Sequence, residues 1–108
     1  MLKGTIIENS LGNKDILKTI QIVKNWAEDD WVLYSVLIDE KRIPELAKSL
    51  KKEPWYIHLW EPGKDDVIVI FPNKVFILKF SDKSTWADTV AYGKSIGIPK
   101  HQLDFPID

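Results

Sequence analysis

The chain contains no cysteine, and this absence removes several classes of site at once. Without thiols there is no disulfide, no thiolate zinc site, no iron–sulfur cluster and no cysteine nucleophile. P-loop, G-x-G-x-x-G, G-x-S-x-G and H-E-x-x-H motifs are missing as well. We therefore expect no cofactor and no metal, and the lack of thiols fits a reducing, cytoplasmic compartment.

Arginine is scarce too. Arg42 is the only arginine among the 15 basic residues, and the chain has 16 acidic residues. Nucleic-acid-binding surfaces usually carry a basic surplus and arginine side chains that fork to phosphates. Nucleic acid is therefore a disfavoured partner. No apolar run approaches the roughly 18 residues that a membrane helix needs, and the first residues lack the apolar region of a secretory signal. We expect no contact with a membrane.

The length of 108 residues is typical of a single domain. No internal repeat, low-complexity tract or linker rich in proline, glycine or serine divides the chain. We therefore expect residues 1–108 to form one domain around one hydrophobic core.

Apolar spacing predicts the elements of the first half. Residues 1–8 and 31–38 are typical of strands that end at turn signals. Residues 13–18 predict a short helix, followed by a strand that reaches Trp26. The stretch 15–26 also carries a helical apolar stripe, but its β-branched residues lose side-chain freedom in a helix, which favours the strand.

The second half predicts a helix, a three-stranded meander and a last helix. Ile43-Pro44 opens the first helix, since proline is tolerated at the first helical position, and Pro54 ends it. The meander comprises residues 55–61, 67–71 and 75–80.

The last helix has clear end signals. Thr85 with Asp88 three residues later resembles a capping box, and Gly97 predicts the C-terminal end. Its expected inner stripe is Trp86, Ala87, Val90 and Ala91.

This order of elements predicts an α+β domain. We expect a two-layer sandwich with a mainly antiparallel sheet of five or six strands and two or three helices on one face. The first six elements follow the βαββαβ order of ferredoxin-like folds, which is a likeness of order alone.

The meander strands are apolar on both faces. Because side chains alternate along a strand, Tyr56, His58 and Trp60 share one face of the strand 55–61, and apolar residues fill the other. The strand 67–71 has no polar face at all. Such strands require burial on two sides, whereas the expected helices cover one.

Three hypotheses account for the second face. The tail and loops cover it, with Trp26, Trp31 and residues 98–107 as the closing segments. Alternatively, a second copy of the chain packs on it to form a homodimer, or a small ligand or protein partner occupies it. Contiguous exposed apolar patches usually mark interaction sites.

The leading functional hypothesis is a small, non-catalytic binding or regulatory domain that uses this aromatic face. Aromatic side chains suit interface anchors as well as small cores. The candidate ligand or partner residues are Tyr56, His58, Trp60, Phe76 and Phe80.

Two alternative functions remain open from the sequence. His58 lies within a predicted strand and titrates near neutral pH, so it is the candidate general base of a small hydrolase or isomerase, with Glu61 or a nearby aspartate orienting it. Aromatic residues beside lysines such as Lys24 and Lys83 are the basis of the other alternative, which is single-stranded nucleic-acid binding.

Overall fold

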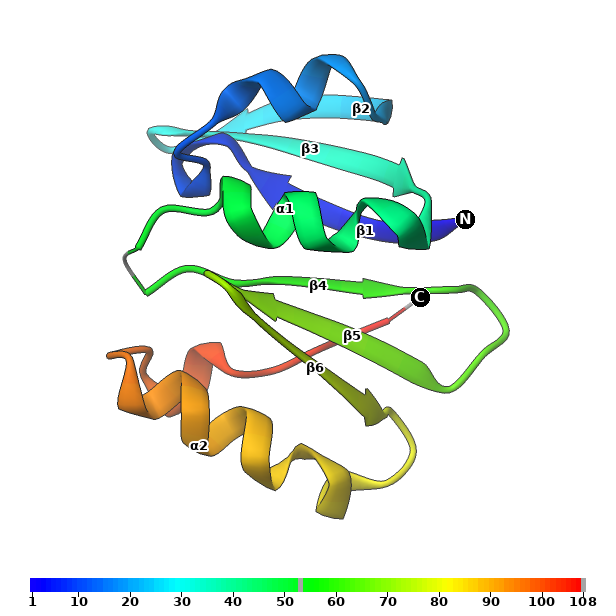
Figure 1. Ribbon diagram of the computed structural model, residues 1–108, viewed down its shortest axis with the longest axis vertical. Helices are drawn as coiled ribbons and strands as arrows, with labels where there is room; N and C mark the ends of the chain where they lie inside the picture. The colour runs from blue at the N-terminus through cyan, green and yellow to red at the C-terminus, as the bar shows by residue number, and fades with distance from the viewer. Residues whose placement is uncertain (53, 108) are drawn as a thin grey trace.

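The computed structural model describes residues 1–52 and 54–107, and a six-stranded sheet runs through this part of the chain (Figure 1). The strand order is β2-β3-β1-β4-β5-β6, and every neighbouring pair is antiparallel. The strands are β1 (Leu2–Ile7), β2 (Gln21–Glu28), β3 (Trp31–Ile38), β4 (Ile57–Trp60), β5 (Asp66–Phe71) and β6 (Lys74–Lys79). The α-helices are α1 (Ile43–Ser49) and α2 (Ala87–Ser95). The expected α+β class with an antiparallel sheet is confirmed.

Local turn chemistry explains why the strands end where they do. Asp29 and Asn73 adopt φ of 55° and 60° in the turns between β2 and β3 and between β5 and β6. Aspartate and asparagine tolerate this left-handed conformation better than other residues with a Cβ. Pro72 before Asn73 supplies the fixed negative φ that opens the second turn. The predicted hairpin between β5 and β6 is therefore confirmed.

The first helical segment differs from a ferredoxin-like element. Lys14–Lys18 forms a 3-10 helix, and β2 follows it, as the strand interpretation of this stretch requires. A single 3-10 segment provides too little cover to act as the first crossover helix. The ferredoxin-like likeness is not confirmed.

The first α-helix stops earlier than Pro54 predicts. It ends at Ser49, because Leu50 is extended and forms a bridge with Leu11. The carbonyl of Ser49 accepts from the Gly12 N–H at 2.7 Å, which holds the segment before β2 against the end of α1. A tertiary contact therefore ends this helix before the proline does.

The second α-helix also starts differently from the prediction. Asp82, rather than Thr85, is the capping residue, and its side chain accepts from the Ser84 N–H at the start of a 3-10 turn (Lys83–Trp86) that leads into α2. The Thr85 hydroxyl instead accepts from the Lys79 N–H at 2.9 Å. Thr85 thus ties the helix entry to β6, and the predicted capping box is wrong.

The two helices lie on opposite faces of the sheet, so the expected placement on one face is wrong. Ile68 and Ile70 of β5 pack in the cluster that includes Leu46 of α1, and we name this side the α1 face. Val67 and Val69 pack in a second cluster with residues of the α2 region, and we name that side the α2 face. Figure 1 shows α1 across the sheet between β1 and β4, with α2 at the β6 end. The sequence predicts one hydrophobic core, whereas the structure has two clusters, and both contain residues of β5.

The inner stripe of α2 matches the prediction in part. Trp86 is buried and Val90 is half-buried, whereas Ala87 and Ala91 are exposed. Thr89 and Gly93 take the inward positions instead. A Cβ at Gly93 would lie 2.6 Å from Leu103 Cδ2, so the glycine allows the C-terminal segment to pack directly on the helix.

The C-terminal segment Leu103–Ile107 completes the α2 face. Phe105 is 0% exposed and belongs to the second cluster together with Leu103 and Ile98. In Figure 1 the segment, drawn in red, runs from the region after α2 toward the end of β4, on the side of the view where the N-terminus lies. The hypothesis that residues 98–107 close this face is confirmed for the β4–β6 half. Among the described residues no helix is long and apolar enough to cross a membrane.

We predict that Phe105→Ala lowers the free energy of unfolding by about 3–5 kcal/mol, because it leaves a cavity where a fully buried ring had been. Chemical denaturation measures this loss. The exposed neighbour Gln102 offers a matched control, and Gln102→Ala should change stability by less than about 0.5 kcal/mol. Equal stabilities of the two variants would contradict the placement of Phe105.

Candidate functional site

The five expected site residues share the α2 face. Val69 of β5 is the register partner of both His58 on β4 and Phe76 on β6, so their side chains point to the same side. Tyr56 and Trp60 lie on the side of His58 by alternation. Trp60 is buried, and the others, Tyr56, His58, Phe76 and Phe80, are half-buried.

The C-terminal segment covers Tyr56 and His58. The Tyr56 hydroxyl donates to the carbonyl of Gln102, and it lies 3.2 Å from the carbonyl of Asp104. His58 Nε2 lies 2.8 Å from the carbonyl oxygen of Pro106, which can only accept, so this nitrogen carries the proton. These bonds hold the segment against β4.

The ring of Phe105 inserts between the side chains of this covered region. Its centroid lies 5.5 Å from Tyr56, 5.8 Å from His58 and 5.1 Å from Trp86. His58 also stacks on Trp60 at 5.3 Å. The part of the aromatic face that the sequence points to is therefore occupied by the chain itself.

Phe76 and Phe80 belong to a separate part of the α2 face. Phe76 contacts Tyr92 of α2 with ring centroids 5.5 Å apart. Phe80 contacts Trp86 at 6.2 Å. The structure thus does not bring Phe76 and Phe80 together with His58 in one cavity.

A groove remains beside the covered region, lined mostly by residues of the α2 face together with Trp55 and Ile57 from the α1-face cluster. The α2 cluster covers the β4–β6 half of the sheet, and the neighbouring half, built by β1 and β3, contributes the floor through Thr5, Ile7 and Leu33. The groove has a volume of about 650 Å³. Its lining comprises Thr5, Ile7, Trp31, Leu33, Pro54, Trp55, Tyr56, Ile57, His58, Ile98 and Gln102. Of the five expected residues, two line it.

Two tryptophans form one wall of the groove. The rings of Trp31 and Trp55 meet edge to face with centroids 5.8 Å apart, and Trp31 is 45% exposed. The expectation that Trp31 closes the apolar face is therefore wrong. Trp31 opens β3 and Trp55 precedes β4, so this pairing depends on strand ends that are far apart in the sequence.

The groove lining carries no formal charge in the described part of the chain. None of its residues is acidic, lysine or arginine, and burial lowers the pKa of His58 below its ordinary value of 6.5, although Pro106 and Asp104 act in the opposite direction. Burial likewise raises the pKa of Tyr56, so its hydroxyl stays protonated. A charged ligand would lose hydration here without gaining an ionic partner.

Glu61, one of the carboxylates that the enzyme hypothesis assigns to His58, pairs with other groups, while Asp104 acts on His58 through its charge alone. Glu61 lies 3.0 Å from Lys64 Nζ and 3.6 Å from the amino group of Met1. Because Nε2 of His58 binds the carbonyl of Pro106, only Nδ1 would remain for a reaction. No cluster of metal-ligating side chains occurs among residues 1–52 and 54–107.

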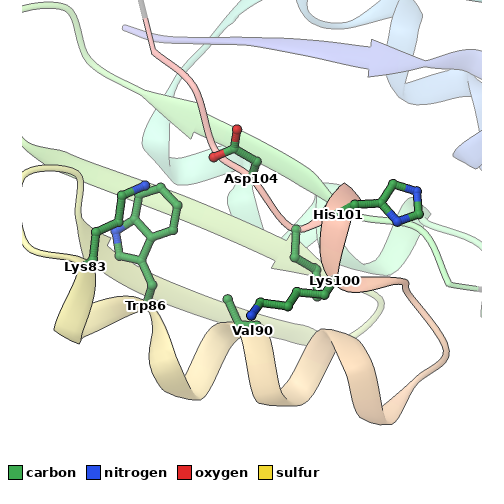
Figure 2. A pocket seen from close by; sticks show the side chains of 7 residues that line it. Lys83, Trp86, Val90, Lys100, His101 and Asp104 are labelled. Carbon is green, nitrogen blue, oxygen red and sulfur yellow. The ribbon is translucent and has the colours of Figure 1, made fainter.

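A second, shallower cleft lies between α2 and the C-terminal segment (Figure 2). Lys83 Nζ lies 3.4 Å from the centroid of Trp86, which makes a cation–π contact. Figure 2 shows Lys100 extended toward Val90, whereas Asp104 and His101, which also line the cleft, point in other directions. The charged groups do not converge on one point, so this cleft lacks the geometry of an ion-binding site.

Comparisons of the chain with protein-family models, with curated proteins and with solved structures give no match. Inference about function therefore depends on the geometry of the groove.

We predict that His58 makes the protein less stable in acid. Because its folded pKa lies below 6.5, the unfolded chain binds more protons, and the free energy of unfolding falls as pH drops from about 6.5 through the folded pKa. Above that range this contribution is constant. Denaturation between about pH 7.5 and pH 5 measures the fall.

The matched variant is His58→Gln, whose amide can still donate to the carbonyl of Pro106. We expect it to flatten the pH dependence, whereas His101→Gln at an exposed position should retain it. An unchanged slope in His58→Gln would show that His58 is not the titrating group.

Proposed function

We propose that the chain is a non-catalytic binding domain that holds a small, uncharged, ring-containing ligand in the groove beside Trp31 and Trp55. The observation that carries the proposal is the lining, which combines aromatic and aliphatic side chains with no acidic, lysine or arginine residue in the described part of the chain. Ligand pockets are typically apolar with a few placed polar groups. A neutral ligand is favoured because nothing in the groove would compensate a buried charge.

The dimensions of the groove support a small-molecule ligand. Its volume of about 650 Å³ falls in the range of roughly 300–1,000 Å³ that is typical of such sites. Trp31 and Trp55 already contact each other edge to face. An inserted ring can add to this arrangement, because aromatic rings prefer edge-to-face and offset packing.

The chain between α2 and the C-terminal segment supports the proposal by forming another wall of the groove. Gln102 and Ile98 line the groove from this side, and the bond from Tyr56 to the carbonyl of Gln102 holds the wall in place. Tyr56 and His58 therefore offer their rings to a ligand, while the Tyr56 hydroxyl and Nε2 of His58 remain bonded to the protein. A wall positioned in advance reduces the ordering cost of binding.

The proposal predicts that indole binds more tightly than indole-3-carboxylate, which has the same ring system but carries a charge. Titration of ¹⁵N-labelled protein, followed through the indole N–H signals of the five tryptophans, measures both affinities. We expect the Trp31 and Trp55 signals to move with indole. We also expect the carboxylate to bind about tenfold more weakly or worse, which corresponds to about 1.4 kcal/mol.

Thr5 provides the matched variants, because it lies on the groove floor and is exposed. Thr5→Phe should fill the groove and abolish indole binding, whereas Thr5→Val should retain it, and both residues suit a strand. Equal affinity of the two probes, or indole binding that survives Thr5→Phe, would refute the proposed site.

A further inference from the structure

The outer edge of β6 presents backbone groups that no described residue satisfies. The Phe80 N–H donates across the hairpin to Asp65 at 2.8 Å, whereas the Lys79 N–H donates on the other side to a hydroxyl at 2.9 Å. Backbone groups of successive residues in a strand point to opposite sides. Val75 and Ile77 therefore share the orientation of Lys79 and direct their N–H and C=O groups away from β5.

Both ends of this edge are already closed. At one end, the Thr85 hydroxyl accepts from the Lys79 N–H, and Trp86 Nε1 donates to the Lys79 carbonyl at 2.8 Å. At the other end, the Asn73 N–H donates to the carbonyl of Ala47 at 3.3 Å. The open stretch is the middle of β6.

The side chains of the open stretch are apolar and exposed. Val75 is 39% and Ile77 is 68% exposed on the α1 face. Natural edge strands usually carry charges or bulges that prevent pairing. The opposite edge, β2, follows this rule, since it has a register shift at Val23 and carries Lys24 and Glu28. In β6 the charges, Lys74 and Lys79, stand only at the two ends of the strand.

We propose that two copies of the chain pair along β6 in antiparallel orientation, with the two-fold axis at Phe76. In this register Val75 lies opposite Ile77 of the partner subunit, and Ile77 lies opposite Val75 of the partner subunit. The two residues of each pair exchange both of their N–H···O bonds. The apolar side chains of each pair then cover one another on the α1 face. The interface is isologous, as most homodimer interfaces are.

The closed ends of the edge select this register. An axis at Val75 would place Ile77 opposite Asn73 of the partner subunit, whose N–H is already bonded to Ala47. An axis at Ile77 would place Val75 opposite Lys79 of the partner subunit, whose N–H and C=O are both taken. Only the axis at Phe76 pairs the open residues Val75 and Ile77 with each other, and it leaves the closed Asn73 opposite the closed Lys79 of the partner subunit.

Sedimentation equilibrium of the wild type and of Ile77→Lys tests the dimer. We expect twice the monomer mass for the wild type and the monomer mass for Ile77→Lys, because a charge then replaces an apolar side chain in the pairing strand. Val23→Lys places the same charge on the other edge strand and should remain dimeric. A wild type that is monomeric at every concentration, or an Ile77→Lys variant that stays dimeric, overturns the proposal.

Cysteine cross-linking tests the register and does not depend on the stability of the lysine variant. Since the chain has no cysteine, Phe76→Cys introduces a single thiol that would face its own copy across a pair with Cα atoms about 4.5 Å apart, within disulfide reach. In Ile77→Cys the two thiols are offset along the strands beyond that reach. We expect oxidation to cross-link the first variant and not the second, and the reverse pattern overturns the proposed axis.

Discussion

Burial of β5 on both of its faces is the constraint from which the rest of the structure follows. Five successive residues, Val67–Phe71, are buried, with Ile68 and Ile70 on the α1 face and the others on the α2 face. Burial of each such side chain contributes about 1.5–3 kcal/mol. A single layer of helices could satisfy only half of this requirement, so the chain supplies separate cover for each side.

The two covers are of different kinds. The α1 face is closed by a helix and by the segments before β2, whereas α2 and the C-terminal segment share the other face. The second cover spans only the β4–β6 half of the sheet, and the uncovered half next to it becomes the groove with Trp31 and Trp55 on its wall. The groove is therefore a consequence of incomplete cover, and Ile98 and Gln102 line it from the covered side.

Sequence patterns predict the strands well because each strand carries its own local signal. Residues 31–38 match β3 at both ends, and the alternation along β4 and β5 correctly separates the two faces. The cover could not be predicted in the same way, because it depends on contacts between segments distant in the sequence. Phe105 stands in an irregular tail without periodicity. Thr85 resembles a helix cap through its spacing to Asp88, although its hydroxyl accepts from the Lys79 N–H six residues earlier. The Trp31–Trp55 wall of the groove was missed for the same reason.

The placement of Phe105 against the α2 face is the central claim, and nuclear Overhauser effects between ring protons test it most directly. The structure predicts cross-peaks from the Phe105 ring to the rings of Tyr56, His58 and Trp86, which lie 5.1 to 5.8 Å away between centroids. A Phe105 ring with random-coil shifts and no cross-peaks to any of these three rings would contradict the account.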